Sequence, residues 1–399
     1  MNAAGTVDDA WQAYRQAIDT LRARMLASPL AADPADRVRA YHWIMQAEAA
    51  AYNLVIAPRP SHPRFLTHTV FEPNLYTWLL PNADFLYRYA FVDGTKTFRI
   101  TGRPGTAHFL EAQVIGGFWG NPGLKLGRTY DFERFTRNAD GSLEIIVGPE
   151  KPTRYPNWIE TNPDFATNTI IIREAFWDWS SERASTLTIG PVEVVPPPSP
   201  LDDTSLTARI DAAARMIEFC FNTFSGGLTE QVLGKVGTNR FLLVDTSKDE
   251  HASNPSAGYV PAVYELEDNE ALIVEIAPPK GRYWNIHLGD VWWQVTDYTY
   301  RQSSLNGQQA IPDTDGIVRV VISAHDPGVA NWLDPAGNPK GVALVRWYFA
   351  ERYPEPMARK VALAALKTEL PPGTAMANHA ERSHALAERQ GAVMRRYGY

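Results

Sequence analysis

Apolar residues near the start of the chain recur every three or four positions, which is the period of an amphipathic helix. The first such stripe comprises Val7, Trp11, Tyr14, Ile18, Leu21 and Met25. Pro29 follows the stripe and is predicted to stop the helix. A second helix is predicted to begin at Asp33-Pro34, where a capping side chain precedes a proline of the first turn. Its stripe comprises Val38, Tyr41, Met45, Ala49 and Tyr52. Each pattern is typical of a helix that packs one face on a core.

The pattern changes to short β-rich runs between about 58 and 195, where Gly, Pro, Asn and Asp separate the runs. The clearest runs are 97–101, 109–115, 143–147 and 169–172. This alternation predicts a first antiparallel β domain. The proline-rich segment 196–200 can form neither a helix nor a central strand, so it is predicted to be a stiff linker.

A third helix is predicted after the linker, with Asp203 or Thr204 as its cap and Gly226-Gly227 at its end. Its apolar face comprises Leu206, Ile210, Ala213, Ala214, Ile217 and Phe221. Cys220 lies in this helix with no basic or histidine residue near it in sequence. We therefore interpret it as a small core residue rather than a reactive thiol.

A second set of β-rich runs follows, and the chain then returns to helix. The predicted strands are 271–276, 283–288, 291–295, 317–323 and 342–349, and the predicted C-terminal helices are 357–370 and 375–396. No internal repeat is convincing. The predicted domains are N-terminal helices 1–57, a first β domain 58–195, a linker and helix 196–228, a second β domain 229–350, and C-terminal helices 351–399. The fold class is mainly β with flanking helices (α+β), with two β-sandwich or open-barrel lobes joined by a helix.

Length and composition bound the function classes. A chain of 399 residues is long enough for two domains. Its single cysteine allows no internal disulfide, and its N-terminus has no basic segment followed by an apolar run. No stretch approaches the roughly 20 apolar residues of a membrane span. These features predict a cytoplasmic protein with no membrane partner. The net charge is −7 and the basic residues are dispersed, which argues against nucleic acid as a partner.

The second β domain carries a long, ordered string of motifs. The string is Tyr283-Trp284-Asn285-Ile286-His287-Leu288-Gly289-Asp290, Trp292-Trp293, Asp297, Ser304-Leu305-Asn306, Asp315-Gly316, His325-Asp326-Pro327-Gly328, Asn331-Trp332-Leu333-Asp334, Gly341 and Arg346-Trp347. It resembles the bacterial domain-of-unknown-function 1214 family. The stretch 82–88, with its continuation to Gly102, is similar to the N-terminal module that accompanies that domain. The resemblance spans about 82–348 and implies a β-rich fold of two modules. It brings no catalytic residue list.

One candidate site lies on the strand predicted at 283–288. In a strand, Tyr283, Asn285 and His287 share one face, and the opposite face is apolar. Trp292 and Trp293 follow the next turn. The polar row is either one wall of a cleft or the solvated face of a sheet, and the tryptophans favour the cleft.

Arg346 and the His325 loop are the next candidates. Arg346 shares a strand face with apolar residues, where a guanidinium needs a partner. Asp297, Asp326 and Asp334 are the candidate carboxylates. The alternatives are a structural ion pair and the capture of a substrate carboxylate. His325 suits proton transfer at neutral pH, although His325 and Asp326 are equally compatible with ordinary turn chemistry.

The first β domain offers Asp84, Tyr87 and Trp119. Asp84 and Tyr87 are either a turn residue and a core residue, or an acid–base pair that faces the second lobe. Trp119 lies in the glycine-rich loop 116–120. Its ring is either exposed at the lip of a pocket or tucked inward.

No metal-binding spacing, dinucleotide fingerprint, phosphate loop or nucleophile elbow occurs in the chain. We therefore expect no metal and no cofactor.

These candidates predict a cofactor-independent enzyme, a lyase, isomerase or hydrolase. It would act on a small aromatic, polycyclic or glycosidic molecule in an aromatic-lined cleft between the lobes. His325 or His287 would move protons, and Asp84, Tyr87 or Asp326 would share that role. Arg346 would bind negative charge, and the other binding residues would be Asn285, Asn306, Trp119, Trp292, Trp293, Trp332 and Tyr283. The alternative is a non-catalytic protein that binds a glycan or a hydrophobic ligand. The oligomeric state stays open, a homo-oligomer included.

Overall fold

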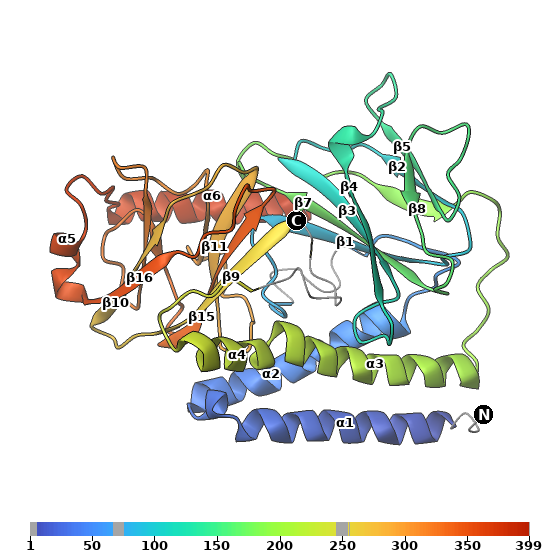
Figure 1. The fold of residues 1–399 in the computed structure, drawn as a ribbon, viewed down its shortest axis with the longest axis horizontal. Coiled ribbons are helices and arrows are strands. Elements are labelled where there is room, and N and C mark those ends of the chain that lie inside the picture. The colour runs from blue at the N-terminus through green and yellow to red at the C-terminus, as the bar shows by residue number, and fades with distance from the viewer. Residues whose placement is uncertain (1–5, 67–75, 245–253, 255, 399) are drawn as a thin grey trace.

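Two β lobes lie side by side along one layer of helices (Figure 1). The computed structural model describes residues 6–66, 76–244, 254 and 256–398. The helices are α1 (Val7–Ala27), α2 (Pro34–Ala51), α3 (Asp203–Phe224), α4 (Gly226–Val236), α5 (Leu366–Glu369) and α6 (His379–Tyr397). The α+β fold class with two β lobes is confirmed.

The first lobe is a sandwich of two four-stranded sheets. One sheet has the order β1 (Phe85–Val92), β7 (Asn168–Ala175), β3 (Phe109–Gly116) and β4 (Lys125–Asp131). The other has the order β6 (Trp158–Glu160), β5 (Leu143–Gly148), β2 (Phe98–Gly102) and β8 (Thr188–Pro191). Branched and aromatic side chains from both sheets alternate inward and form one buried core.

The second lobe is built in the same way. Its sheets have the orders β12 (Ser304–Asn306), β11 (Tyr283–Gly289), β15 (Lys340–Tyr348), β9 (Ala257–Glu265), and β14 (Trp332–Leu333), β13 (Val318–Ser323), β10 (Glu270–Ile276), β16 (Met357–Ala362). Again the two sheets enclose one core between them.

The two lobes repeat one topology strand for strand. Strands β9 to β16 pair in the same order as β1 to β8, down to the single parallel pair in each lobe, β5 with β6 and β13 with β14. The chain therefore contains a structural duplication, where the sequence showed no convincing repeat. The strand order depends on the alternation of apolar and polar residues and on the positions of turns. Many different sequences meet both requirements.

The lobes meet through the outer faces of the sheets that contain β7 and β15. Phe85 and Phe109 from the first lobe pack on Tyr283 and Tyr348 from the second. The ring centroid of Phe85 lies 5.2 Å from that of Tyr283 and 5.2 Å from that of Tyr348. These buried rings join the lobes directly.

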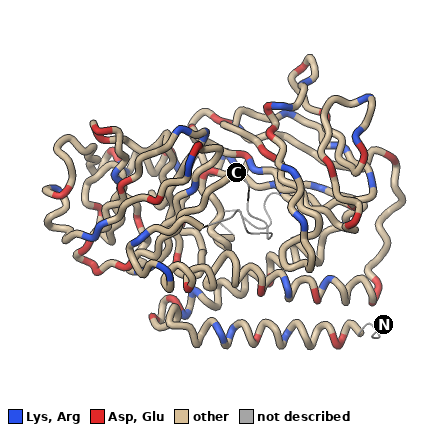
Figure 2. The backbone as a smooth tube through the Cα atoms, viewed as in Figure 1, with Lys and Arg blue, Asp and Glu red and all other residues tan. Residues whose placement is uncertain are grey.

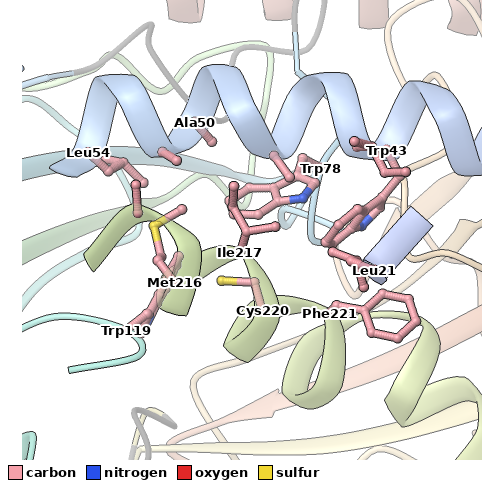
Figure 3. Close-up of a cluster of buried hydrophobic side chains, with 14 of the residues drawn as sticks. Leu21, Trp43, Ala50, Leu54, Trp78, Trp119, Met216, Ile217, Cys220 and Phe221 are labelled. Atoms are coloured by element: carbon pink, nitrogen blue, oxygen red, sulfur yellow. The ribbon is translucent and has the colours of Figure 1, made fainter. Parts of the chain in front are cut away.

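The helices pack on one another and on both lobes. Figure 3 shows Trp43 and Ala50 of α2, and Leu54 of the π-helical turn Tyr52–Ile56 that follows it, against Ile217 and Phe221 of α3. As predicted, Cys220 of α3 is buried in this cluster.

The stripe predicted for the second helix is not its packing face. Val38 is 68% exposed, Met45 67% and Tyr52 60%. The buried face instead contains Ala40, Trp43, Ile44, Ala47 and Ala50. The small alanines allow neighbouring elements to approach closely, and a search for large apolar residues overlooks them.

Three further element predictions are wrong. Segment 357–370 is not one helix, because its first part is strand β16, paired with β10. Segment 291–295 forms no strand, since Trp293 has a φ of 63° in a turn. Gly226-Gly227 opens helix α4 directly after α3, whose cap is Asp202 rather than Asp203 or Thr204.

Two glycines of α4 should respond in opposite ways to alanine. A Cβ at Gly226 would lie 2.7 Å from Phe221 and 2.9 Å from Trp292, whereas one at Gly234 would meet nothing within 4 Å. Gly226→Ala should lower the free energy of unfolding by about 1–3 kcal/mol through overpacking. Gly234→Ala should raise it by ~0.4–1 kcal/mol, because alanine restricts the unfolded chain and favours helix. Denaturant titration of both variants measures these changes, and equal effects would contradict the packing described here.

Candidate functional site

A cavity of about 150 Å³ lies between the two lobes, where helices α3 and α4 pass. Each lobe contributes one arginine, one tryptophan and two tyrosines to its wall, and one tyrosine of each lobe lies beside the arginine. The residues beside or near the arginines are Tyr87, Arg173 and Trp119 from the first lobe, and Tyr259, Arg346 and Trp293 from the second; Tyr89 and Tyr348 are the other two tyrosines. Phe224 of α3 and Leu228 of α4 complete an apolar side.

These lining residues occupy equivalent positions in the duplicated lobes. Tyr87 on β1 pairs with Arg173 on β7, and Tyr259 on β9 pairs with Arg346 on β15. The strands β1 and β7 of the first lobe correspond to β9 and β15 of the second. The duplication therefore places two copies of one Tyr–Arg pair around a single cavity.

Arg346 is buried, with 6% of its surface exposed. Its Nη2 donates to the carbonyl oxygen of Leu80 at 2.6 Å, and its Nη1 contacts Nε2 of His287. The guanidinium carbon lies 5.8 Å from the ring centroid of Tyr259. Among the described residues no carboxylate pairs with this guanidinium.

The carboxylates expected beside Arg346 lie elsewhere. Asp326 pairs with Arg382 at 3.0 Å, and Asp334 pairs with Arg301 at 2.8 Å. The side chain of Asp297 accepts from the backbone of its own turn. The expected pairing of Arg346 with one of these residues is therefore wrong.

His287 is fully buried on β11, directly behind Arg346. Burial and the Arg346 guanidinium hold the pKa of His287 well below its ordinary value. The imidazole is therefore neutral, and its Nε2 can accept from Arg346. Its Nδ1 has no hydrogen-bond partner among the described residues. This arrangement positions Arg346 rather than supplying an acid.

Arg173 differs from Arg346 because a carboxylate accompanies it. Its Nη1 lies 3.4 Å from Oε1 of Glu111, and its Nη2 donates to Oε1 of Gln113 at 2.9 Å. Glu111 also accepts from the amide of Asn254. Burial raises the pKa of Glu111, while the guanidinium and the amide oppose that rise. The ion pair offsets the charge of Arg173 within its own lobe.

Asp84 is the centre of a polar network that ties the lobes together. Its Oδ1 accepts from Trp179 at 2.7 Å and from Asn306 at 2.9 Å, and its Oδ2 accepts from Tyr283 at 2.5 Å and from Asn285 at 3.0 Å. Burial raises the pKa of Asp84, and these hydrogen bonds oppose the rise. Four predicted site residues therefore lie together, and their side chains are buried. They are Asp84, Tyr283, Asn285 and Asn306. All four hydrogen bonds to the Asp84 carboxylate are made within the protein.

The remaining predicted residues lie away from the cavity. The side chain of His325 is 64% exposed and lies 3.1 Å from Asp268. Trp332 packs under Arg382 of α6, and Trp292 is buried among the helices, where its indole donates to Asp36. The described structure brings neither ring to the Tyr–Arg pairs.

Four predicted residues line the cavity, namely Tyr87, Trp119, Trp293 and Arg346, and His287 contacts the last of them. Sequence reasoning missed Tyr259, Arg173 and Glu111. The sequence held one signal for Tyr259, which is the equal spacing of two Asn–Tyr pairs. Asn82 precedes Tyr87 by five positions, and Asn254 precedes Tyr259 by the same interval.

The family model described as a protein of unknown function (DUF1214) matches residues 89–173 and 265–352. The chain carries a domain of the DUF1214 family. One matched segment lies in each lobe, and Arg173 and Arg346 fall inside them. The DUF1214 match therefore includes both arginines of the cavity.

Two solved structures are similar to the chain to different degrees. An uncharacterized protein from Burkholderia cenocepacia is 26% identical, with a TM-score of 0.81, over 89% of this chain and 97% of that one. A protein from Vibrio parahaemolyticus is 12% identical, with a TM-score of 0.46, over 80% of this chain and 98% of that one. No curated protein matches the chain.

The described residues contain no group of three or more His, Cys, Asp or Glu side chains placed to hold a metal ion. Within the same residues, no helix combines the length and apolar character needed to cross a membrane.

The turn after β11 positions Trp293 through a buried carboxylate. Asp290 accepts from the backbone amides of Trp292 and Gln294 at 2.9 and 3.0 Å, and from the Gln294 side chain at 2.7 Å. The Trp293 indole then donates to Thr229 of α4 at 2.9 Å. Burial raises the pKa of Asp290 to about 6.

Asp290 should make stability depend on pH. The unfolded carboxyl titrates near ~3.9, so between about pH 4 and pH 6 the folded state holds more protons. The free energy of unfolding should therefore fall as pH rises through this window, by about 2–3 kcal/mol from this group. Asp290→Asn should remove that slope. Denaturant titrations at pH 4, 5 and 6 measure it, and parallel profiles for the two proteins would contradict the assignment.

Proposed function

We propose that this DUF1214 protein binds a small organic acid with one aromatic or similarly compact apolar ring in the cavity between its lobes. The observation that carries this proposal is Arg346, a buried guanidinium on a ring-lined wall. Its contacts among the described residues are a carbonyl oxygen, a neutral imidazole and a tyrosine ring.

A ligand carboxylate suits Arg346 for electrostatic reasons. A buried charge without a counter-charge is costly, and a guanidinium offers five N–H donors in a planar fork. The Leu80 and His287 contacts leave donors that a carboxylate can engage. Such charged hydrogen bonds are roughly twice as strong as neutral ones.

The size of the cavity limits the apolar part of the ligand. A volume of about 150 Å³ is comparable to that of a cavity which holds one benzene molecule. This favours a single ring over the polycyclic ligands that the sequence also allowed. Trp119, Trp293 and Phe224 provide the apolar contact surface.

Cofactor-independent catalysis is the second candidate, and Tyr87 favours it. Burial raises the pKa of the Tyr87 phenol, while Arg346 and Arg173 oppose that rise. The phenol therefore stays protonated at neutral pH, and it lines the cavity, where a bound ligand could exchange a proton with it as a lyase, isomerase or hydrolase requires. The alternative is binding without turnover.

The proposed partner is a small molecule, not nucleic acid or a membrane. Lys and Arg are interspersed with Asp and Glu over both lobes (Figure 2), so we expect no phosphate-backbone contact. We also propose a cytoplasmic location, since a lone, buried cysteine suits a reducing compartment.

Removing the Arg346 charge should weaken acid binding. We expect Arg346→Gln to lower the affinity for 4-methylphenylacetate by about 10- to 100-fold, since a hydrogen bond to a charged group contributes ~1.5–3 kcal/mol. Binding of the uncharged 4-methylphenylacetamide should change little. Isothermal titration calorimetry measures both. Arg382→Gln is the matched control, because Arg382 is equally buried but lies outside the cavity. Equal affinity of Arg346→Gln and wild type for the acid would contradict the proposal.

Tyr87→Phe separates catalysis from binding alone. If Tyr87 donates a proton to the ligand, this variant should bind an acid that the wild type converts but should not convert it. Mass spectrometry of the mixture after incubation measures conversion, and calorimetry measures binding. Unchanged conversion by Tyr87→Phe would contradict the role of Tyr87, whereas binding without conversion by the wild type would favour the alternative.

A further inference from the structure

We propose that Glu111 sets the charge of the ligand, so that the cavity accepts monoanions and discriminates against dianions. The first lobe lines one half of the cavity with Arg173, and the second lobe lines the other half with Arg346. The acid group of the ligand lies in the Arg346 half, and its uncharged end lies in the Arg173 half. This inference rests on the proposed function and adds the orientation and charge class of the ligand.

The two halves of the cavity share one tyrosine and one arginine position. Tyr87 corresponds to Tyr259, and Arg173 corresponds to Arg346. The cross-strand partners of the two arginines also correspond to each other. Glu111 pairs with Arg173 across β3 and β7, and Asn285 pairs with Arg346 across β11 and β15.

The acceptors behind the arginines are also equivalent. Two positions beyond Glu111 lies Gln113, and two positions beyond Asn285 lies His287. Gln113 accepts from Arg173, and His287 contacts the guanidinium of Arg346 in the same way. Both acceptors are neutral, so neither one distinguishes the charges of the halves.

Among the residues that pair with the two arginines, the halves differ in charge at Glu111 and Asn285. Both side chains are fully buried. The Glu111 carboxylate faces Arg173 and neutralises it. The Asn285 amide carries no charge and donates to Asn82 and Asp84. Counted over the described residues, the Arg173 half is thus neutral overall, and the Arg346 half carries one positive charge.

Asp84 does not cancel the charge of Arg346. Its two oxygens accept four hydrogen bonds from other residues. The guanidinium groups of Arg389 and Arg396, both on α6, act on its carboxylate. The charge of Asp84 is therefore balanced by the two arginines of α6.

A second carboxylate on the ligand would lie at Arg173, whose charge Glu111 already offsets from behind the cavity wall. Like charges in a site with little water repel strongly, and Arg173 is already paired. An uncharged end of the ligand meets no such electrostatic repulsion in the Arg173 half. This half also includes the indole N–H of Trp119. That buried donor has no hydrogen-bond partner among the described residues. The arrangement therefore favours an acid at one end and a neutral or hydrogen-bond-accepting group at the other.

The test compares three probes that share a ring and flexible arms: 4-methylphenylacetate as the monoanion, 1,4-phenylenediacetate as the dianion and 4-methylphenylacetamide as the neutral compound. Calorimetry at pH 7.5 is expected to show that the wild type binds the monoanion at least about tenfold more tightly than the dianion. Glu111→Gln should move this ratio at least about tenfold toward the dianion, because it frees Arg173 to bind a second carboxylate.

Two variants control for folding and for charge. Glu174→Gln removes another fully buried glutamate of the first lobe, one that pairs with Arg88 at 2.5 Å outside the cavity, and should keep the wild-type ratio. Glu111→Asp keeps the carboxylate and should keep the preference for the monoanion. The wild-type ratio tests the preference for monoanions over dianions, the charge rule, even if Glu111→Gln does not fold.

The outcomes separate the two proposals. Equal or tighter binding of the dianion by the wild type overturns the charge rule and leaves the proposed function standing. A folded Glu111→Gln with an unchanged ratio overturns the role of Glu111. If the wild type binds neither acid, the proposed function fails and the charge rule fails with it.

Discussion

The burial of two sheet faces against each other is the constraint on which the rest of the structure depends. Each lobe already encloses a core between its own two sheets. The outer faces that contain β7 and β15 carry further rings, and these are covered only because the lobes meet. Asp84 and its four donors fix the lobes in register, since a buried carboxylate must have each partner in place. The cavity is the part of this contact that side chains do not fill.

Much of the fold could be predicted from the pattern of apolar and polar residues along the chain. Strands such as β3, β5, β10 and β13 stand out because their apolar residues are dense and turn residues flank them. The errors arose where tertiary contacts outweigh local pattern. Val38 and Met45 resemble a packing face, yet the alanines of α2 pack inward. Strand β16 resembles a helix in composition, and its pairing with β10 decides its conformation.

The candidate site was less predictable because it depends on residues far apart in sequence. Tyr87, Trp119, Trp293 and Arg346 were identified from residue type and position, and all four line the cavity. His325 resembled a catalytic residue because it follows a strand, but no local pattern shows which end of a lobe faces the other lobe. Arg173 lies in an apolar strand whose pattern fits a core. Its significance emerges only from the correspondence of β7 with β15, which no single-sequence pattern reveals.

The duplicated topology has a consequence for how such a site can be specialised. When two identical subunits build a pocket on a twofold axis, every group in it occurs twice, so the pocket treats the two ends of a guest molecule alike. Here both copies belong to one polypeptide, and a substitution in one copy leaves the other untouched. Covalent linkage thus frees the pocket from symmetry, and a molecule whose ends differ can be held in a single direction.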